Sequence, residues 1–408
     1  MTRSLWRPSA LSVAALFCAA LLASKIVSFG AADVLAARDP AAALLRDASH
    51  ADALTLLAQR QLTAQRPELS AATRLVAVDP LAPGALSLYA AGLGRLGETA
   101  RADHAMSVAA AHLPIDLIAD TWLFKRALQS GDAAAALEAL DTGLRARPYA
   151  AYESGGSAAR LLALGPSAEE GFALRLAAAP PWREQLLESL ALNAPDAAPL
   201  QRLQERLRAS AAPPTQKETR ALLERLVRDG RYDAAYLAWL NSLPAAKLST
   251  LGLLYNGALT EPVSNLPFDW QIAPPRGSTA LVVDDRGERR LALDFFGARV
   301  AFSHVRHLLA LPPGAYVFSG ESEARALVND RGLRWRIFCV EDPAGALAVT
   351  PALQGSAQRS AFRVAFTVPA EACRAQMLLL EIPAQIESDW RISGSARYAR
   401  LAVAPASP

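Results

Sequence analysis

A 34-residue spacing of turn-forming residues constrains the fold of this chain more than any other feature of its sequence. Gly97 and Gly131 lie 34 residues apart, and so do the successive prolines Pro80, Pro114 and Pro148. Agreement of three intervals at one period indicates an internal repeat. Because glycine accepts the backbone angles of a sharp turn and proline ends a helix, this period predicts a row of helix pairs.

Further residues accompany these turns. They are Gly97, Ala102, Met106 and Pro114 in one stretch, Gly131, Ala136, Leu140 and Pro148 in the next, and Gly230 and Ala235 farther along the chain. This pattern resembles the tetratricopeptide repeat, which implies that the glycines form the turn within a helix pair, that Ala102, Ala136 and Ala235 lie where the two helices touch, that Met106 and Leu140 pack between them, and that the prolines close each unit. Alanine suits a contact position because it allows the helix backbones to approach closely. The resemblance also implies an α-solenoid with a concave surface that docks a protein partner.

The resemblance has departures. The first helix of each unit lacks the family's Trp, Gly and Tyr, and Asp120 occupies a position that is usually apolar. Helical spacing of leucines nevertheless continues beyond the strongest repeats. We therefore expect a helical repeat domain over residues 32–261.

The first 31 residues predict a membrane segment. Arg3 and Arg7 precede an uncharged run from residue 10 to residue 23. If the helix continues past Lys25 it covers about 20 residues, enough to cross a bilayer, with the lysine amine near the outer boundary. A signal peptide cleaved near Ala23 or Ala31 is the alternative. The two arginines keep the N-terminus in the cytoplasm, so the expected location is a single pass through the bacterial inner membrane with the bulk of the chain in the periplasm.

Residues 262–408 have the pattern of a strand-rich domain. Pro262, Pro267, Pro274 and Pro275 exclude a continuing helix, and short apolar runs follow at turn-bounded intervals. No stretch is long enough for a helical crossover between parallel strands. The fold class that follows is multidomain, α then β, ending in an antiparallel β-sandwich.

Several segments of this domain resemble the jelly-roll carbohydrate-binding modules of bacterial envelope and secreted proteins. They are "LPPGAYVFSG", "LRWRIFCV", "FRVAFTVP" and "ARYARLAV". The resemblance implies sugar binding through exposed aromatic rings with polar neighbours. The candidate glycan contacts are Trp390, Tyr316 and Trp270, with Trp390 favoured by its charged context "ESDWRISG".

Two cysteines lie in the exported strand-rich domain, Cys339 at a strand end and Cys373 just before a later strand. In an oxidising compartment a pair of cysteines predicts a disulfide bond.

Other function classes find little support in the sequence. The net charge is only +3, and the arginines alternate with acidic residues, which disfavours nucleic acid as a partner. The five histidines lack partners at metal-ligand spacing; His304 and His307, three apart, would point to opposite faces of a strand. No phosphate-binding loop or nucleophile elbow is found. We therefore expect no catalytic residues, no metal and no cofactor.

Together these features predict a non-enzymatic periplasmic scaffold or adaptor. The helical repeats would dock a protein partner, and the sandwich would bind a glycan or another envelope protein. The architecture resembles anchored repeat proteins of bacterial polysaccharide assembly or export systems, which implies a role in exopolysaccharide production. The alternatives are a purely structural protein-interaction module and a glycan-modifying enzyme.

Overall fold

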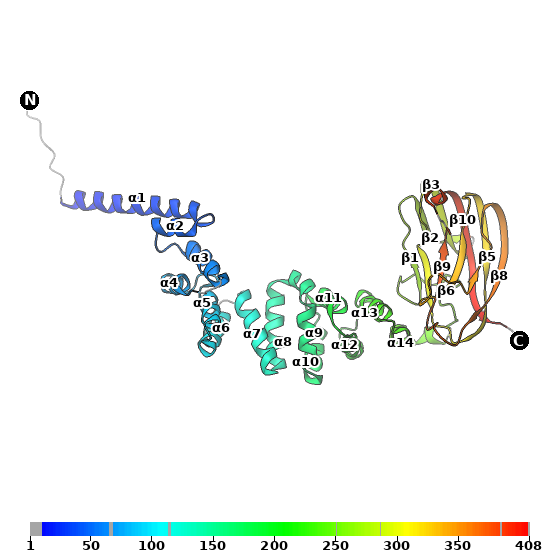
Figure 1. Cartoon of the computed structure of the whole chain (residues 1–408), viewed down its shortest axis with the longest axis horizontal. Helices are drawn as coiled ribbons and strands as arrows, with labels where there is room; N and C mark the ends of the chain where they lie inside the picture. Colours follow the sequence, from blue (N-terminus) through cyan, green and yellow to red (C-terminus); the bar gives the residue numbers. More distant parts are fainter. Residues whose placement is uncertain are drawn as a thin grey trace, which may run out of the picture. The chain divides into compact units, whose positions relative to one another are not determined.

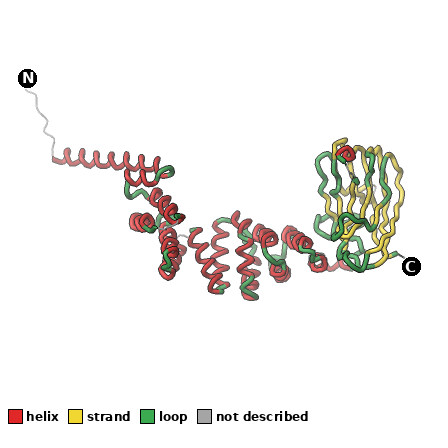
Figure 2. The backbone as a smooth tube through the Cα atoms, in the orientation of Figure 1, coloured by secondary structure: helices red, strands yellow, loops and turns green. Residues whose placement is uncertain are grey.

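The computed structural model describes residues 10–64, 68–112, 116–249, 251–285, 287–383 and 386–406. Contacts between residues divide the chain into two compact units, Met1–Leu190 and Ala191–Pro408. Helices occupy the N-terminal part and strands the C-terminal part (Figures 1 and 2). The predicted fold class is confirmed. Pro114, which was expected to close a repeat, lies outside the described residues.

The first unit is built from consecutive helices. They are α1 Ala10–Ala36, α2 Pro40–Arg46, α3 Ala51–Thr63, α4 Ser70–Val78, α5 Ala85–Arg95, α6 Thr99–His112, α7 Leu117–Ser130, α8 Ala133–Ala146, the 3₁₀ helix η1 Pro148–Glu153, α9 Gly155–Leu162, α10 Pro166–Ala177 and α11 Arg183–Asn193, whose last turn lies in the second unit.

The glycines singled out in the sequence form the turns between paired helices. Gly97, Gly131 and Gly230 have φ angles of +85°, +74° and +67°, which favour glycine because a side chain would be strained there. They separate α5 from α6, α7 from α8, and α13 (Gln216–Arg228) from α14 (Tyr232–Leu240). The predicted contact residues Ala102, Met106, Ala136, Leu140 and Ala235 are all buried, whereas Pro148 begins η1.

Helix α1 has two parts that differ in their surroundings. Its large apolar side chains from Val13 to Phe29 are exposed, whereas Ala32 and Ala36 are buried against Ala43 and Ala53. Among the described residues, α1 is the one helix that is long and apolar enough to cross a membrane. By length and composition it is a candidate for a membrane anchor or a signal sequence.

The second unit adds the helices α12 (Ala198–Arg208), α13, α14 and α15 (Ala245–Leu248) to the strands. Trp239 of α14 packs on Phe268, at a distance of 5.8 Å between the ring centroids, and Gln216 of α13 donates a hydrogen bond to the carbonyl of Ser264. These contacts explain why the last helices group with the sandwich. The predicted domain ranges 1–31, 32–261 and 262–408 stay predictions.

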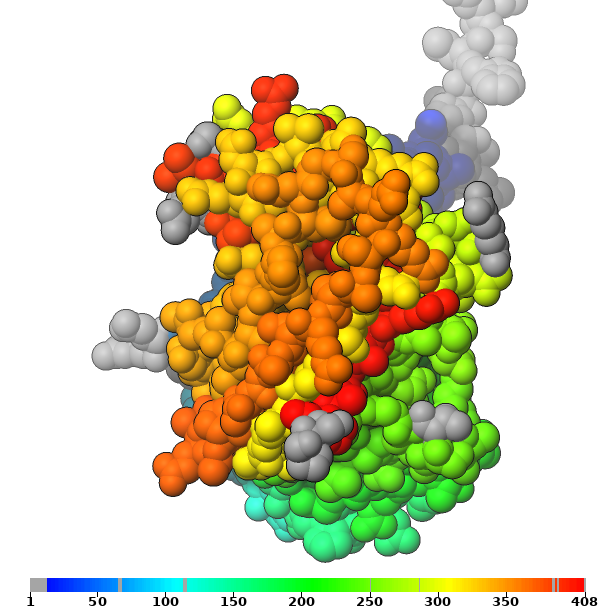
Figure 3. All heavy atoms as spheres, turned by 90° about the vertical axis from the view of Figure 1, so that its right-hand side faces the viewer, coloured from blue at the N-terminus to red at the C-terminus, as the bar shows by residue number. Residues whose placement is uncertain are grey.

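Two antiparallel sheets form the sandwich. The short sheet has the order β1-β4-β9-β6-β7, with β1 Trp270–Ile272, β4 Val305–Leu309, β6 Arg334–Cys339, β7 Ala348–Val349 and β9 Gln376–Glu381. The long sheet has the order β2-β3-β10-β5-β8, with β2 Ser278–Asp285, β3 Glu288–Arg299, β5 Gly314–Val328, β8 Gly355–Val368 and β10 Arg391–Pro405. In Figure 3, β8 (orange) runs obliquely across the visible face, followed by β5 and the C-terminal end of β10 (red).

One apolar core fills the space between these sheets. Its centre is the Trp335 ring, whose centroid lies 5.5 to 5.9 Å from those of Trp270, Phe318 and Tyr398. Cys339 and Cys373, the predicted pair, form a disulfide bond in the structure, with their Cα atoms 5.0 Å apart. The bond links the end of β6 to the segment that precedes β9.

Candidate functional site

The outer face of the long sheet carries a groove of about 650 Å³. Leu293 of β3, Ala324 of β5 and Tyr398 of β10 point into the core. Because side chains alternate between the two faces of a strand, the residues beside them point outward. Most of the outward positions that line the groove in these three strands are polar, so this face is exposed to solvent while the opposite face is buried.

Strand register brings together residues that are far apart in the sequence. Arg397 of β10 lies opposite Ala292 of β3 and opposite Glu323 of β5. Two residues along the same strands, Ser395 lies opposite Asp294 and Arg325. The groove is therefore lined by residues paired across neighbouring strands, and no local sequence motif predicts it.

Arginines and carboxylates alternate across the groove. Arg290 contacts three carboxylates, those of Asp285, Glu288 and Glu323, at distances of 3.0, 2.9 and 3.5 Å. Arg397 pairs with Asp294 at 3.1 Å. The result is a network in which most charges are already compensated.

Arg359 of β8 forms ion pairs at the edge of this network. Its guanidinium contacts Glu288 at 2.7 Å and also contacts Glu321. The hydrogen bond from Arg359, followed by one from Arg290, lowers the pKa of Glu288 to about 2. Arg325 differs from the others because its side chain is 81% exposed, although it touches Glu323. Donors and acceptors thus stand side by side at the surface of a rigid sheet.

An exposed aromatic ring, Phe296 of β3, lies at one end of the same face. It is 67% exposed, and it lies opposite Ser393 of β10, which in turn lies opposite the exposed Val328 of β5. Phe296 was not among the candidate contacts predicted from the sequence. The signal was the adjacent pair Phe295 and Phe296, since two neighbouring rings in one strand face opposite sides and only one can enter the core.

Two of the three glycan contacts predicted from the sequence lie in the core. Trp270 is fully buried, and its indole N–H donates to the carbonyl of Asn256 at 2.9 Å. Tyr316 is 6% exposed, and its hydroxyl donates to the carbonyl of Pro312 at 2.8 Å. Neither ring offers a face to a ligand, so these two predictions were wrong. Both rings satisfy their polar atoms internally, as buried Trp and Tyr usually do.

Trp390 lies at the end of the 3₁₀ helix η2 (Glu387–Trp390) and is partly exposed. Its neighbour Asp389 is buried and bonds Arg331 at 3.0 Å, while the amide of Asn329 donates to the carbonyl of Asp389 at 2.7 Å. Asp389 therefore anchors the loop and does not face a ligand. Trp390 stays a candidate contact.

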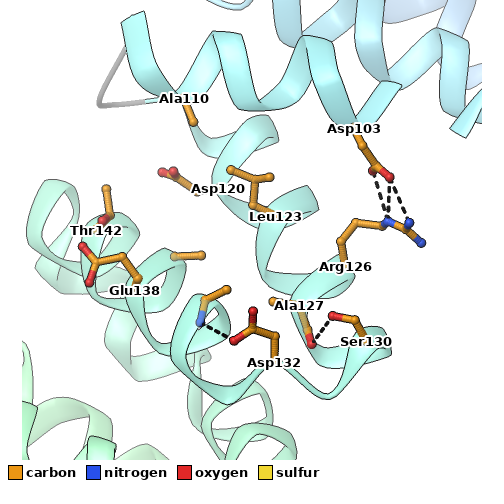
Figure 4. A pocket seen from close by; sticks show the side chains of 12 residues that line it. Asp103, Ala110, Asp120, Leu123, Arg126, Ala127, Ser130, Asp132, Glu138 and Thr142 are labelled. Atoms are coloured by element: carbon orange, nitrogen blue, oxygen red, sulfur yellow. Dashed lines mark hydrogen bonds and ion pairs between the residues drawn. The ribbon is translucent and has the colours of Figure 1, made fainter. Parts of the chain in front are cut away.

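A second groove, of about 520 Å³, lies among α6, α7 and α8 of the helical unit (Figure 4). At one end Arg126 forms an ion pair with Asp103 at 2.9 Å, and Asp103 also accepts the indole N–H of Trp122 at 2.8 Å. Farther along, Asp120 and Glu138 line the same groove. Acidic side chains outnumber the single arginine in this lining.

Asp120 is the carboxylate of this groove that is perturbed most. Its pKa is raised to about 6, first by burial and then by the nearby charge of Asp116, while Arg147 acts in the opposite direction. A carboxylate at a usually apolar position is thus held in a half-buried site. A cationic group in the groove would stabilise the ionised form of Asp120.

No group of side chains that could hold a metal ion is found in the described part of the chain. His304 and His307 do not converge: His304 precedes β4, and His307 is buried within it. The ring nitrogens of His307 face the carbonyls of Leu308 and Tyr255 at 2.9 and 3.1 Å, and burial lowers its pKa to about 4. His307 packs against Trp270 and contributes to the packing of the sandwich core.

No family model and no curated protein matches this chain. Solved structures do match its sandwich region. One described as "CBM4 structure and function" is 17% identical and covers 38% of this chain and 99% of its own, with a TM-score of 0.29. A "Family 16 Carbohydrate Binding Module-2" is 14% identical over 38% and 99% of the two chains, with a TM-score of 0.27. The enzymatically active domain of bacteriophage CBA120 tailspike protein 4 is 10% identical, with a TM-score of 0.27, over 38% of this chain but only 21% of its own.

Proposed function

We propose that this protein is a membrane-anchored, non-enzymatic scaffold whose sandwich binds a carbohydrate chain along the outer face of the long sheet. The observation that carries the proposal is the groove on that face, in which arginines and carboxylates alternate on neighbouring strands.

The chemistry of the groove suits sugar hydroxyl groups. A sugar hydroxyl both donates and accepts hydrogen bonds. It therefore binds best where a guanidinium donor and a carboxylate acceptor lie next to each other. Arg325 beside Glu323, and Arg397 beside Asp294, are such pairs. Because the charges are largely compensated, the groove favours a neutral or weakly charged glycan over a polyanion.

Phe296 supplies the apolar element that sugar binding needs. The faces of pyranose rings carry C–H groups that pack on aromatic rings, and carbohydrate sites commonly combine one such ring with convergent polar groups. Phe296 lies two residues along β3 from Asp294, about 7 Å away, on the same face.

The helical region would serve as the docking arm of the scaffold. Its turns and buried alanines support the resemblance to tetratricopeptide repeats, and the acidic groove among α6, α7 and α8 suits a basic segment of a protein partner. With α1 as an anchor, the sandwich would act on the periplasmic side of the bacterial inner membrane, in the assembly or export of an exopolysaccharide.

The test measures the affinity of the full chain, in lipid nanodiscs, for the exopolysaccharides of the bacterium that makes this protein. Arg325→Ala and Phe296→Ala are each expected to weaken binding about tenfold or more, while Arg306→Ala on the outer face of the short sheet leaves it unchanged. Both arginines are exposed, so neither truncation should alter folding. Equal affinity of all three variants would contradict the proposed groove.

Trp390→Ala distinguishes the groove from the loop at η2. Loss of binding in this variant with an unchanged melting temperature would place the sugar at the loop instead. If the wild-type chain binds none of the envelope glycans, the sandwich is a structural or protein-docking unit. Recovered glycan of unchanged length is expected, and shortened glycan would overturn the non-enzymatic assignment.

A further inference from the structure

Helix α1 is longer than a bilayer requires. Its 27 residues span about 40 Å, whereas the hydrocarbon core takes about 20 residues, or 30 Å. About seven residues must therefore project from the bilayer. Burial identifies them, because Ala32 and Ala36 pack against Ala43 and Ala53, while the large side chains from Val13 to Phe29 are exposed.

The next helix turns back toward the membrane. Helix α2 lies beside the last turns of α1 (Figure 1). Asp47, directly after α2, lies 3.8 Å from the amine of Lys25, and His50 stacks on Phe29 with 5.1 Å between ring centroids. The C-terminal end of α2 is thus level with residues 25 to 29 of α1, the outermost turn of the segment assigned to the bilayer.

The Lys25–Asp47 pair defines the level of the membrane surface. A lysine amine within the hydrocarbon core is costly, so Lys25 must reach the headgroup region. Its partner Asp47 is held by Ser49, whose hydroxyl and backbone N–H donate to the carboxylate. A fixed carboxylate within reach of this amine places the end of α2 at the boundary between lipid and water.

Leu45 and Arg46 are the side chains that α2 presents there. Leu45 is 88% exposed, more than any other large apolar side chain in the described part of the chain, and Arg46 beside it is also exposed. An apolar side chain next to a cation matches the interface, where Leu enters the acyl boundary and Arg meets phosphate.

We propose that the C-terminal end of α2 docks on the outer surface of the bilayer, with Leu45 inserted at the headgroup level and Arg46 against lipid phosphates. This inference rests on the proposed membrane anchoring by α1. The bilayer is the occupant because this surface continues the exposed apolar surface of α1. Helix α2 and the helices packed on it would then be fixed in their orientation to the membrane.

The test measures the depth of single probes. In a Cys18→Ser background, where Cys339 and Cys373 are disulfide-bonded, Leu22→Cys, Leu45→Cys and Tyr149→Cys each provide one thiol for an environment-sensitive fluorophore. All three positions are exposed, so labelling should leave the fold intact. The full chain is placed in vesicles of phosphatidylethanolamine and phosphatidylglycerol that contain a lipid with a quencher near its headgroup.

The probe at position 45 is expected to lose about half of its fluorescence, and the probe at position 149 almost none. Quenching at position 22 but not at 45 would overturn the docking of α2 and leave the anchor standing. No quenching at position 22, or a purified chain that begins after it, would overturn both. Equal quenching at 45 and 149 would also overturn the inference, because the helical unit would then lie along the membrane.

Arg46→Glu in the labelled Leu45→Cys chain tests the contribution of charge. Reduced quenching in vesicles with phosphatidylglycerol supports the contact between Arg46 and phosphate. Unchanged quenching would overturn that part of the inference.

Discussion

The helical unit and the sandwich bury their apolar residues in different ways. In the helical unit, small clusters of alanine and leucine follow one another, such as the cluster around Leu54 and Leu75 and that around Met106. In the sandwich, one cluster joins both sheets and is built around aromatic rings. Helices contact neighbours in sequence, whereas β3 pairs with β10 about 100 residues later. A local change should therefore stay local in the helices and spread through the sandwich.

Their grooves differ as well. In the sheet groove each arginine has carboxylate partners, so its charges are compensated within the site. In the helical groove burial and the nearby charge of Asp116 raise the pKa of Asp120 to about 6, so this carboxylate is less well compensated. The two grooves therefore differ in how their charges are balanced, which is why we propose a different ligand for each.

The largest effect is expected from Trp335→Ala, which removes the ring at the centre of the sandwich core. The loss should be about 4 kcal/mol of unfolding free energy, and hydrogen exchange should rise in every strand. Met106→Ala in the helical unit should cost about 2–3 kcal/mol and raise exchange only from α5 to α7. An exchange increase confined to β6 in Trp335→Ala would contradict the comparison.

Trp335→Phe is the matched control for the sandwich variant. It keeps an aromatic ring and removes the indole N–H, which is buried and has no hydrogen-bond partner among the described residues. We therefore expect Trp335→Phe to cost much less than Trp335→Ala.

Removal of the disulfide is expected to have the next largest effect. The bond closes a loop with a sequence separation of 34 residues, so the double variant Cys339→Ser, Cys373→Ser should lose about 3–4 kcal/mol in the chain-entropy model. Only the unfolding transition of the sandwich should shift in denaturant titrations. Two freely alkylated thiols in the natively purified protein would show that the bond does not form.

Within the helical unit, Gly155 and Gly156 provide a matched pair. A Cβ at Gly155 would lie 2.3 Å from the carbonyl oxygen of Ser189 on α11, whereas a Cβ at Gly156 meets nothing within 4 Å. Gly155→Ala should therefore cost about 1–3 kcal/mol and Gly156→Ala should be neutral or slightly stabilising. Similar melting temperatures for the two variants would show that α9 and α11 do not pack as described.

The smallest effect should come from Asp120→Asn, and it should depend on pH. Because the folded-state pKa of Asp120 is about 6, above the ordinary value of 3.8, the folded state binds more protons and wild-type stability falls as pH rises from about 4 to 6. The full shift would correspond to about 3 kcal/mol, which we reduce to about 1 kcal/mol for solvent screening.

Asp120→Asn should remove this pH dependence and stabilise the helical unit near pH 7. The measurement is the unfolding free energy of wild type and variant at pH 4.5 and pH 7, with Asp132→Asn as a control in the same groove. A wild-type stability that rises over this range through the helical transition would contradict the assignment to Asp120.

Local features of the sequence were sufficient for the elements. The positive φ angles of Gly97 and Gly131 confirm turns that the spacing predicted, because few other residues adopt that conformation. Short apolar runs at turn-bounded intervals likewise predicted the strands. Ala102 and Ala136, which the repeat pattern placed at helix contacts, are fully buried.

The sequence did not predict which face of each strand is buried in the sandwich. Trp270 and Tyr316 were assigned to a sugar site, yet the packing of one sheet on the other covers both rings. Phe296 was passed over although it is exposed. Alternation shows that neighbouring residues in a strand face opposite sides, but it does not show which side the second sheet covers.

By itself, then, the amino-acid sequence determined the apolar N-terminal helix, the helix pairs with their glycine turns, and the order of helices before strands, because each depends on residues close together in the chain. Only the tertiary structure decided the sheet groove, because register aligns Arg290, Glu323 and Arg397 from three strands. It also decided the burial of the candidate rings and the return of α2 along α1. These features depend on contacts between distant segments, and such contacts leave no periodic signal in the sequence.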